Sequence, residues 1–133
     1  MILVDTSAWV EFDRATGSPT DAALTSLIEA GGASMAVTEP VLMEVLAGAR
    51  DEQRHDDLRR LLTGFGWLSI DPVADFEGAA RIYRACRTTG ITPRGLIDCM
   101  IASVAIRTGA SLLATDRDYA DMATVVPLQL ATV

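Results

Sequence analysis

Short apolar runs alternate with longer amphipathic segments along this chain, and that alternation limits the possible folds more than any other feature. The apolar runs predict β-strands at residues 2–4, 34–37, 67–70 and 111–115, with a further edge strand at 125–126. Helical patterns separate these runs, and a helical crossover is the usual way to connect two parallel strands. The sequence therefore predicts an α/β fold with a central parallel sheet.

The helices between the strands are expected from their start and stop signals. Hydroxyl or acidic residues and prolines stand at several expected starts, and glycines follow several expected ends. We expect a helix through residue 12 that is capped by residues 5–7, and further helices at about 20–30, 38–47, 52–63, 71–90, 92–109 and 116–122. A chain of 133 residues has room for one hydrophobic core, so a single domain spanning 1–133 is expected.

The charge of the chain excludes several mechanisms. There are 18 acids against 11 bases, the formal net charge is −7, and every base is arginine. Without lysine the chain cannot use a P-loop lysine, Schiff-base chemistry or the phosphate-binding lysine of aspartate-nucleophile phosphatases. The net negative charge also argues against binding nucleic acid through general electrostatic attraction, because a basic face of the protein normally provides that attraction. If the protein acts on nucleic acid, another source of positive charge is required.

Other sequence signals point to a cytoplasmic protein with no role for its cysteines or histidine in chemistry. The N-terminus lacks the pattern of a secretory signal, and the longest uncharged apolar stretch, residues 99–106, is far too short to span a membrane. Cys86 and Cys99 lie within helical patterns without a metal-binding spacing, so we expect small buried fillers. His55 lies among charged residues that resemble a solvated helix face.

Carboxylates follow two of the expected strands. Asp5 ends the first strand, while Asp116 and Asp118 follow the strand at 111–115. In an open parallel sheet, ligands bind beyond the carboxyl ends of the strands. An aspartate at the end of a buried strand is costly unless a partner binds it. The strand ends are therefore the expected position of a functional site.

Two further acids interrupt apolar helix patterns beside small residues. Glu44 borders the apolar stripe of the helix at 38–47, and Asp98 borders that of the helix at 92–109. Four or five carboxylates gathered at one place repel one another unless a cation neutralises them. Hard ions such as Mg²⁺ or Mn²⁺ prefer such oxygen ligands, and they support phosphate chemistry.

Each acid also has a simpler interpretation when it is taken alone. Asp5 could cap a helix, Glu44 could be a partly exposed helix acid, and Asp116 could form a turn. Asp98 could pair on the surface with Arg94, which would stand one helical turn earlier. Spacing alone leaves these alternatives open.

Four sequence blocks in order resemble the PIN domains, and within them the VapC-type toxins of bacterial toxin–antitoxin pairs. The blocks are Ile-Leu-Val-Asp5-Thr6-Ser7-Ala-Trp-Val, Thr-Glu-Pro-Val-Leu-Met-Glu44-Val-Leu-Ala-Gly48, Ile-Asp98-Cys-Met-Ile-Ala-Ser-Val-Ala and Leu-Leu-Ala-Thr115-Asp116-Arg-Asp118-Tyr119. The resemblance implies a three-layer α/β/α sandwich with a parallel sheet of four or five strands. Tyr119 stands where phenylalanine is common in the family, and residues 50–67 lie in a variable segment.

The resemblance also implies a site and an activity. It places a catalytic tetrad on Asp5, Glu44, Asp98 and Asp116, metal binding on Asp5, Asp98, Asp116 and Asp118, and supporting hydroxyls on Thr6 and Thr115. The implied activity is endonucleolytic cleavage of structured RNA (tRNA, rRNA or mRNA) with Mg²⁺, for which Mn²⁺ can substitute. A homodimer and a basic VapB-type antitoxin are implied too, and the antitoxin often directs an arginine into the acidic pocket.

The arginines of the chain are candidates for steering the RNA backbone. Arg14, Arg94 and Arg117, with Arg87 as a further candidate, could contact phosphates, although surface arginines that only confer solubility are an equally good interpretation.

Two other functions compete with the ribonuclease. One is a catalytically idle binding module whose acidic pocket captures an arginine of a partner protein. The other is phosphoryl transfer with Asp5 as the nucleophile, which the missing lysine and the lack of a second aspartate in Asp5-Thr6-Ser7 disfavour.

Overall fold

The computed structural model describes residues 1–133 and contains five strands and seven helices. In chain order these are β1 (Ile2–Val4), α1 (Thr6–Asp13), α2 (Pro19–Glu29), β2 (Met35–Val37), α3 (Glu39–Ala47), α4 (Glu52–Leu62), β3 (Gly66–Trp67), α5 (Pro72–Thr88), α6 (Leu96–Thr108), β4 (Ser111–Leu113), α7 (Arg117–Ala123) and β5 (Gln129–Leu130). No helix is both long enough and apolar enough to cross a bilayer.

The strands form one parallel sheet in the order β3-β2-β1-β4-β5. From β1 the chain adds β2 and β3 on one side, and then it returns to add β4 and β5 on the other side. The order of strands thus reverses between β1 and β4, where Leu3 pairs with Leu112. A crevice for a ligand forms at such a reversal, beyond the carboxyl ends of the two strands.

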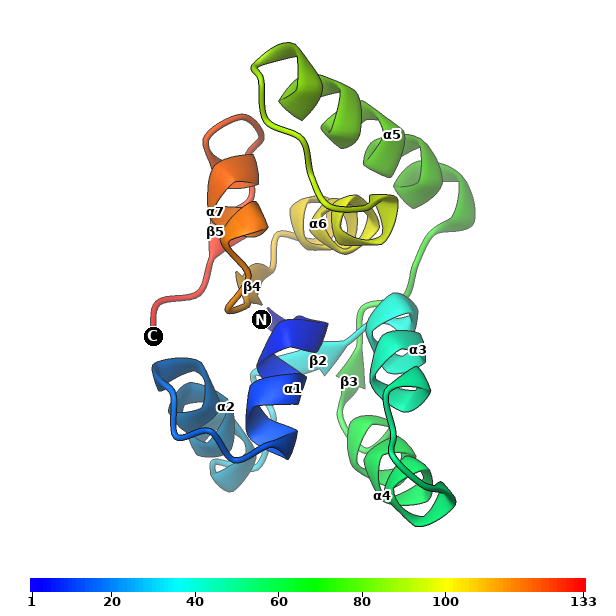
Figure 1. Cartoon of the computed structure of the whole chain (residues 1–133), viewed down its shortest axis with the longest axis vertical. Coiled ribbons are helices and arrows are strands. Elements are labelled where there is room, and N and C mark those ends of the chain that lie inside the picture. Colours follow the sequence, from blue (N-terminus) through cyan, green and yellow to red (C-terminus); the bar gives the residue numbers. More distant parts are fainter.

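Helices cover the sheet on both sides (Figure 1). The pair α5 and α6 lies on one side of the strands and the pair α1 and α2 lies on the other, while α3 and α4 lie beside β3 and α7 lies beside β5. The central strands are almost completely buried, with Leu3, Val4 and Leu112 at 0% exposure. This arrangement confirms the predicted three-layer α/β/α sandwich with a parallel sheet.

Several helices begin where the sequence indicates, because acidic or hydroxyl side chains accept hydrogen bonds from their free N–H groups. Asp5, Ser18, Asp51, Asp71 and Asp116 each cap a helix in this way. These caps fix the direction in which each helix leaves the preceding segment.

Four predicted boundaries are wrong. The strand expected at 111–115 ends at Leu113. The edge strand is Gln129–Leu130, because the N–H groups of Val125 and Val126 donate to the carbonyl of Met122 and extend the end of α7 instead. The strand expected at 67–70 is only Gly66–Trp67. The helix expected from residue 92 begins at Leu96, because the backbone of Gly95 is extended.

An ion pair between a buried aspartate and a partly exposed arginine connects α5 to α6. Asp75 on α5 is 0% exposed, and it accepts hydrogen bonds from Ser103 Oγ at 2.8 Å and from Arg107 Nη2 at 2.8 Å. Burial opposes ionisation of Asp75, but the bonds from Arg107 and Ser103 and from the N–H of Asp71 hold its pKa below the usual value. The carboxylate is therefore charged, and it ties together the two helices on this side of the sheet.

Candidate active site

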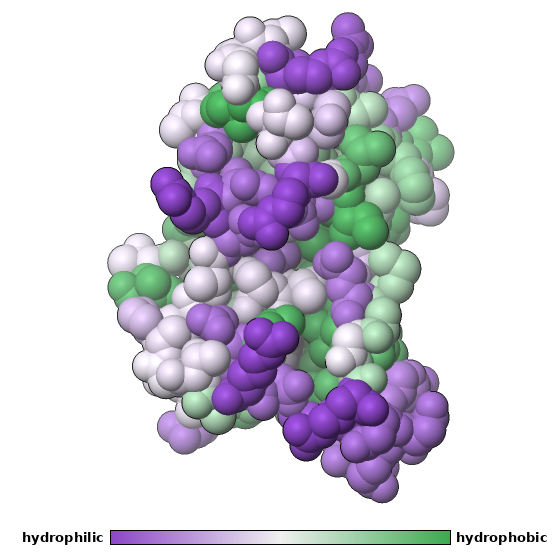
Figure 2. Space-filling model, viewed as in Figure 1, coloured by the Kyte–Doolittle hydropathy of each residue, from purple (hydrophilic) through white to green (hydrophobic).

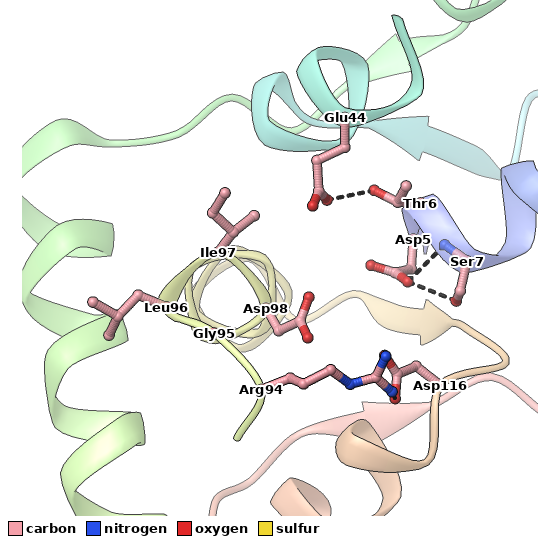
Figure 3. Close-up of a pocket in the computed structure, with 10 residues that line it drawn as sticks. All are labelled: Asp5, Thr6, Ser7, Glu44, Arg94, Gly95, Leu96, Ile97, Asp98 and Asp116. Atoms are coloured by element: carbon pink, nitrogen blue, oxygen red, sulfur yellow. Dashed lines mark hydrogen bonds and ion pairs between the residues drawn. The ribbon is translucent and has the colours of Figure 1, made fainter. Parts of the chain in front are cut away.

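A pocket of about 510 Å³ opens at the point where the strand order reverses (Figure 3). It brings together residues that are far apart in the sequence. Its lining consists of Asp5, Thr6, Ser7, Glu44, Arg94, Gly95, Leu96, Ile97, Asp98 and Asp116. All four acids of the predicted catalytic tetrad thus lie in one pocket, together with Thr6.

Asp5 is the most buried of these acids, at 3% exposure. Its Oδ2 accepts hydrogen bonds from the backbone N–H of Ser7 at 2.9 Å and from Ser7 Oγ at 2.6 Å, and its Oδ1 accepts from Tyr119 Oη at 2.8 Å. Burial raises the pKa of Asp5, while these hydrogen bonds oppose the rise. Asp5 is also the N-cap of α1, so its capping role and its place in the pocket coexist.

Asp98 projects into the pocket from the first turn of α6. Burial raises its pKa from 3.8 to about 6, and the nearby charges of Asp5, Asp116 and Glu44 add to the rise. The acids therefore repel one another strongly enough to favour a bound cation or proton.

Glu44 enters the pocket from α3, on the side opposite to Asp116 (Figure 3). Its Oε1 accepts a hydrogen bond from Thr6 Oγ1 at 2.7 Å, so the hydroxyl orients this carboxylate. The structure thus gives Thr6 a supporting contact with one of the acids.

Asp116 and Asp118 complete the acidic cluster at the start of α7. Asp116 caps the helix, and its Oδ1 accepts a hydrogen bond from the N–H of Asp118 at 2.9 Å. One carboxylate oxygen each of Asp98, Asp116 and Asp118 lies within 4.8 Å of the other two. A single ion could contact all three residues after small side-chain rotations.

Arg94 lies across this cluster. Its Nη2 is 3.1 Å from Asp116 Oδ1, its Nε is 3.4 Å from Asp118 Oδ2, and its backbone N–H donates to Asp118 Oδ2 at 3.2 Å. The hypothesis of a surface pair between Arg94 and Asp98 is wrong, because α6 begins only at Leu96 and residue 94 precedes the helix.

The remaining predicted residues lie at the edge of the pocket or outside it. Thr115 is exposed, its N–H donates to Ser7 Oγ at 3.0 Å, and it lines a shallow hollow next to the pocket. Arg14 and Arg117 are exposed, and neither lines the pocket.

Sequence reasoning missed two contributors to the site. The Ser7 hydroxyl donates to Asp5 and accepts from the N–H of Thr115, so it links the ends of β1 and β4. The Tyr119 hydroxyl lies 3.3 Å from Asp98 Oδ1 as well as 2.8 Å from Asp5 Oδ1. The motif Asp5-Thr6-Ser7 contained the signal for Ser7, but only the fold reveals the position of Tyr119.

The set of donor atoms fits a hard divalent cation. Its members are carboxylate oxygens, without a histidine or cysteine ligand among them, and Mg²⁺ and Mn²⁺ prefer such oxygens. Burial is the main reason for the raised pKa of Asp98, and the neighbouring carboxylates add to it, so negative charge at this position is costly. A cation bound here would compensate that charge.

Comparison with known proteins agrees with this architecture. Residues 2–125 match the family model described as "PIN domain". The chain is 46% identical over 132 residues to VapC ribonuclease Mb1587 of Mycobacterium bovis and to Ribonuclease VapC11 of Mycobacterium tuberculosis, covering 99% of this chain and 98% of each relative.

Solved structures show the same fold at lower identity. VapBC2 from Rickettsia felis, bound to a DNA fragment, superposes with a TM-score of 0.77 at 20% identity and covers 98% of both chains. VapC20 of Mycobacterium tuberculosis, a sarcin-ricin loop cleaving toxin, superposes with a TM-score of 0.71 at 18% identity and covers 97% of this chain and 99% of its own. The full-length similarity in sequence and fold establishes this chain as a VapC-type member of the PIN-domain family.

Proposed function

We propose that residues 1–133, as one PIN domain, form an Mg²⁺-dependent endoribonuclease toxin of a type II toxin–antitoxin pair that cleaves structured RNA: tRNA, rRNA or mRNA. The observation that carries the proposal is the gathering of Asp5, Glu44, Asp98 and Asp116 in one pocket, with a pKa of about 6 at Asp98. The 46% identity to proteins named VapC ribonucleases supports RNA as the substrate.

The residues divide into groups that hold the ion and groups that orient the ligands. Asp5, Asp98, Asp116 and Asp118 would hold Mg²⁺, for which Mn²⁺ could substitute, and Glu44 completes the acidic wall opposite Asp116. A divalent ion bound by carboxylates lowers the pKa of a bound water and stabilises charge on a phosphate. The chain itself would supply the fixed positions of these carboxylates, which the hydrogen bonds from Thr6, Ser7 and Tyr119 orient.

Arginines near the rim are the proposed contacts for the RNA backbone. Arg94 is the strongest candidate, because its side chain is 75% exposed and already lies at the mouth of the acidic pocket. Arg14 and Arg117 would contribute from outside the pocket. Thr115, at the edge, is proposed as a supporting hydroxyl of the site. Phosphate contacts of this kind position the substrate without selecting its sequence.

A basic VapB-type antitoxin is the proposed regulator, acting by inserting an arginine into the pocket. A guanidinium can pair with two carboxylates at once, and the contacts of Arg94 with Asp116 and Asp118 are consistent with such pairing at this site. Structures of related chains described as VapBC or toxin–antitoxin complexes support the existence of a partner.

A homodimer is also proposed. An apolar groove beside α5 includes Met43, which is 53% exposed, and Phe76, which is 58% exposed. Figure 2 shows green apolar side chains gathered on this side of the molecule. A continuous exposed apolar patch is typical of a surface that binds protein.

The decisive experiment is RNA cleavage by Asp98→Asn. The substitution keeps the shape of the side chain and removes its charge, so we expect loss of cleavage with an unchanged circular dichroism spectrum. Asp5→Asn should behave in the same way, and excess EDTA should abolish the activity of the unsubstituted protein. Asp121→Asn, an exposed acid of α7 outside the pocket, is the matched control and should retain activity.

The results separate the competing functions. Full cleavage by Asp98→Asn, or by the unsubstituted protein in EDTA, would refute the proposed mechanism. Tight binding of a partner without metal, combined with no cleavage of any RNA, would favour the idle binding module. Sequencing RNA ends after expression of the chain without its partner would identify the RNA and the bond that is cut.

A further inference from the structure

The Tyr119 hydroxyl touches two acids that come from different parts of the fold. Tyr119 lies on α7 and is 1% exposed, while Asp5 follows β1 and Asp98 lies on α6. The hydroxyl is 2.8 Å from Asp5 Oδ1 and 3.3 Å from Asp98 Oδ1. A single buried group therefore connects three elements at the floor of the acidic cluster.

The protonation of this hydroxyl makes it a donor to both carboxylates. A phenol has an ordinary pKa of about 10, so the Tyr119 hydroxyl carries its proton at neutral pH and can donate it. One O–H can be shared between two acceptors, and each carboxylate has about four lone-pair positions. Asp5 and Asp98 can accept from Tyr119 and still have lone pairs free for a cation.

The hydroxyl also completes the fixation of Asp5. Ser7 donates twice to Oδ2, and Tyr119 donates to Oδ1, so both oxygens of this carboxylate are held. Asp98 has fewer restraints, and Tyr119 is the residue that connects it with Asp5. Hydrogen bonds to the ligands of a metal fix their orientation and raise its affinity.

We propose that Tyr119 is a positioning residue of the acidic site, whose hydroxyl holds Asp5 and Asp98 in the arrangement that binds a divalent cation. The proposal rests on the metal-dependent function proposed above and adds a residue to it. Tyr119 does not itself ligate the ion; it sets the orientation of two side chains that do.

The test is Mn²⁺ binding by the full chain with Tyr119→Phe, measured by electron paramagnetic resonance of free Mn²⁺. The substitution removes one oxygen and keeps the ring that packs in the core. We expect binding to weaken on the order of tenfold, the lower end of the effect of losing a hydrogen bond to a metal ligand. The Mn²⁺ concentration for half-maximal RNA cleavage should rise equally, with little change at saturating Mn²⁺.

Tyr83→Phe is the matched control, because Tyr83 on α5 is the other tyrosine of the chain and lies outside the pocket. It should bind Mn²⁺ like the unsubstituted protein. A merely structural role for the Tyr119 hydroxyl would lower thermal stability without changing the Mn²⁺ affinity of the folded fraction. Equal affinity in Tyr119→Phe and Tyr83→Phe would therefore overturn the proposal.

Two further measurements keep the conclusions separate. Equal Mn²⁺ binding by Asp98→Asn and the unsubstituted protein would overturn the metal site itself, whereas a defect in Asp98→Asn but not in Tyr119→Phe overturns only the role of Tyr119. If Tyr119→Phe does not fold, fluorotyrosine incorporated into Tyr83→Phe reports on Tyr119 alone. Its ¹⁹F resonance should shift during a Mg²⁺ titration, and an unmoved resonance at saturating Mg²⁺ would contradict the proposal.

Discussion

Replacing Asp98 by asparagine should stabilise the metal-free protein, although it should abolish activity. The carboxyl titrates near 6 instead of 3.8 in the folded chain, because burial and the charges of Asp5, Asp116 and Glu44 oppose its ionisation. This difference corresponds to ~3 kcal/mol of stability lost at pH 7. Asparagine removes the charge but can still accept the hydrogen bond from Tyr119, so we expect most of that energy to be recovered.

The sign of the pH dependence makes this prediction specific. Folding binds additional protons between pH 3.8 and about 6, so the penalty of ionised Asp98 is absent below this window and complete above it. The advantage of Asp98→Asn should therefore be large at pH 7 and small at pH 4. It should also shrink when Mn²⁺ is added, because the ion stabilises only the protein that retains its ligand.

Thermal unfolding in EDTA at pH 4 and pH 7 measures this effect directly. An advantage of 2 to 3 kcal/mol should raise the midpoint by roughly 10 °C for a domain of this size. Asp121→Asn, an exposed acid outside the pocket, is the control for loss of one negative charge and should shift the midpoint much less. An equal or lower midpoint for Asp98→Asn at pH 7 would refute the assignment of repulsion to this cluster.

Two further predictions concern arginine pairs in different surroundings. Asp75→Asn should lower the free energy of unfolding by about 2 kcal/mol in urea titrations, because it removes the charge-assisted hydrogen bonds that Arg107, whose side chain is 35% exposed, donates to the fully buried carboxylate. The loss should shrink as the pH falls through the lowered pKa of Asp75. Cleavage per folded molecule should stay unchanged, and an unaltered urea midpoint would contradict the role of the pair. Arg94→Ala should strengthen Mn²⁺ binding by about two- to fivefold, because it removes exposed ion pairs with Asp116 and Asp118 that contribute up to ~1 kcal/mol. The same variant should cleave RNA less well, because it loses a proposed contact with the RNA backbone. Tighter RNA binding by Arg94→Ala would contradict that contact.

The main features of the fold could be predicted because they depend on local patterns. The run Ile2–Val4 followed by Asp5 determines a buried strand and the cap of the next helix within a few residues. Asp116 repeats this pattern after β4, and parallel pairing then places both acids at the same edge of the sheet. The position of the site follows from this repetition.

Features that depend on tertiary contacts could not be predicted. The edge strand at Gln129–Leu130 exists because it pairs with β4, whereas Val125 and Val126 have the stronger β-propensity and instead follow α7. Arg94 contacts Asp118, which is 24 residues away, and the interpretation as a local pair failed for that reason. The contacts of Tyr119 likewise depend on where α7 packs.

Asp75 and Asp98 differ in how their surroundings in the fold compensate the charge of a carboxylate. Asp75 is fully buried beside Arg107 and Ser103, and its pKa is lowered, so the chain itself supplies the compensating charge. Asp98 shares its pocket with other acids, and the pKa of Asp98 is raised to about 6. The nearby Arg94 pairs with Asp116 and Asp118 instead of Asp98. The same fold can thus pair a buried carboxylate with arginine, yet it leaves Asp98 without that partner. The chain supplies no arginine to Asp98, and a divalent ion or a partner's guanidinium has the chemistry to provide the compensating charge.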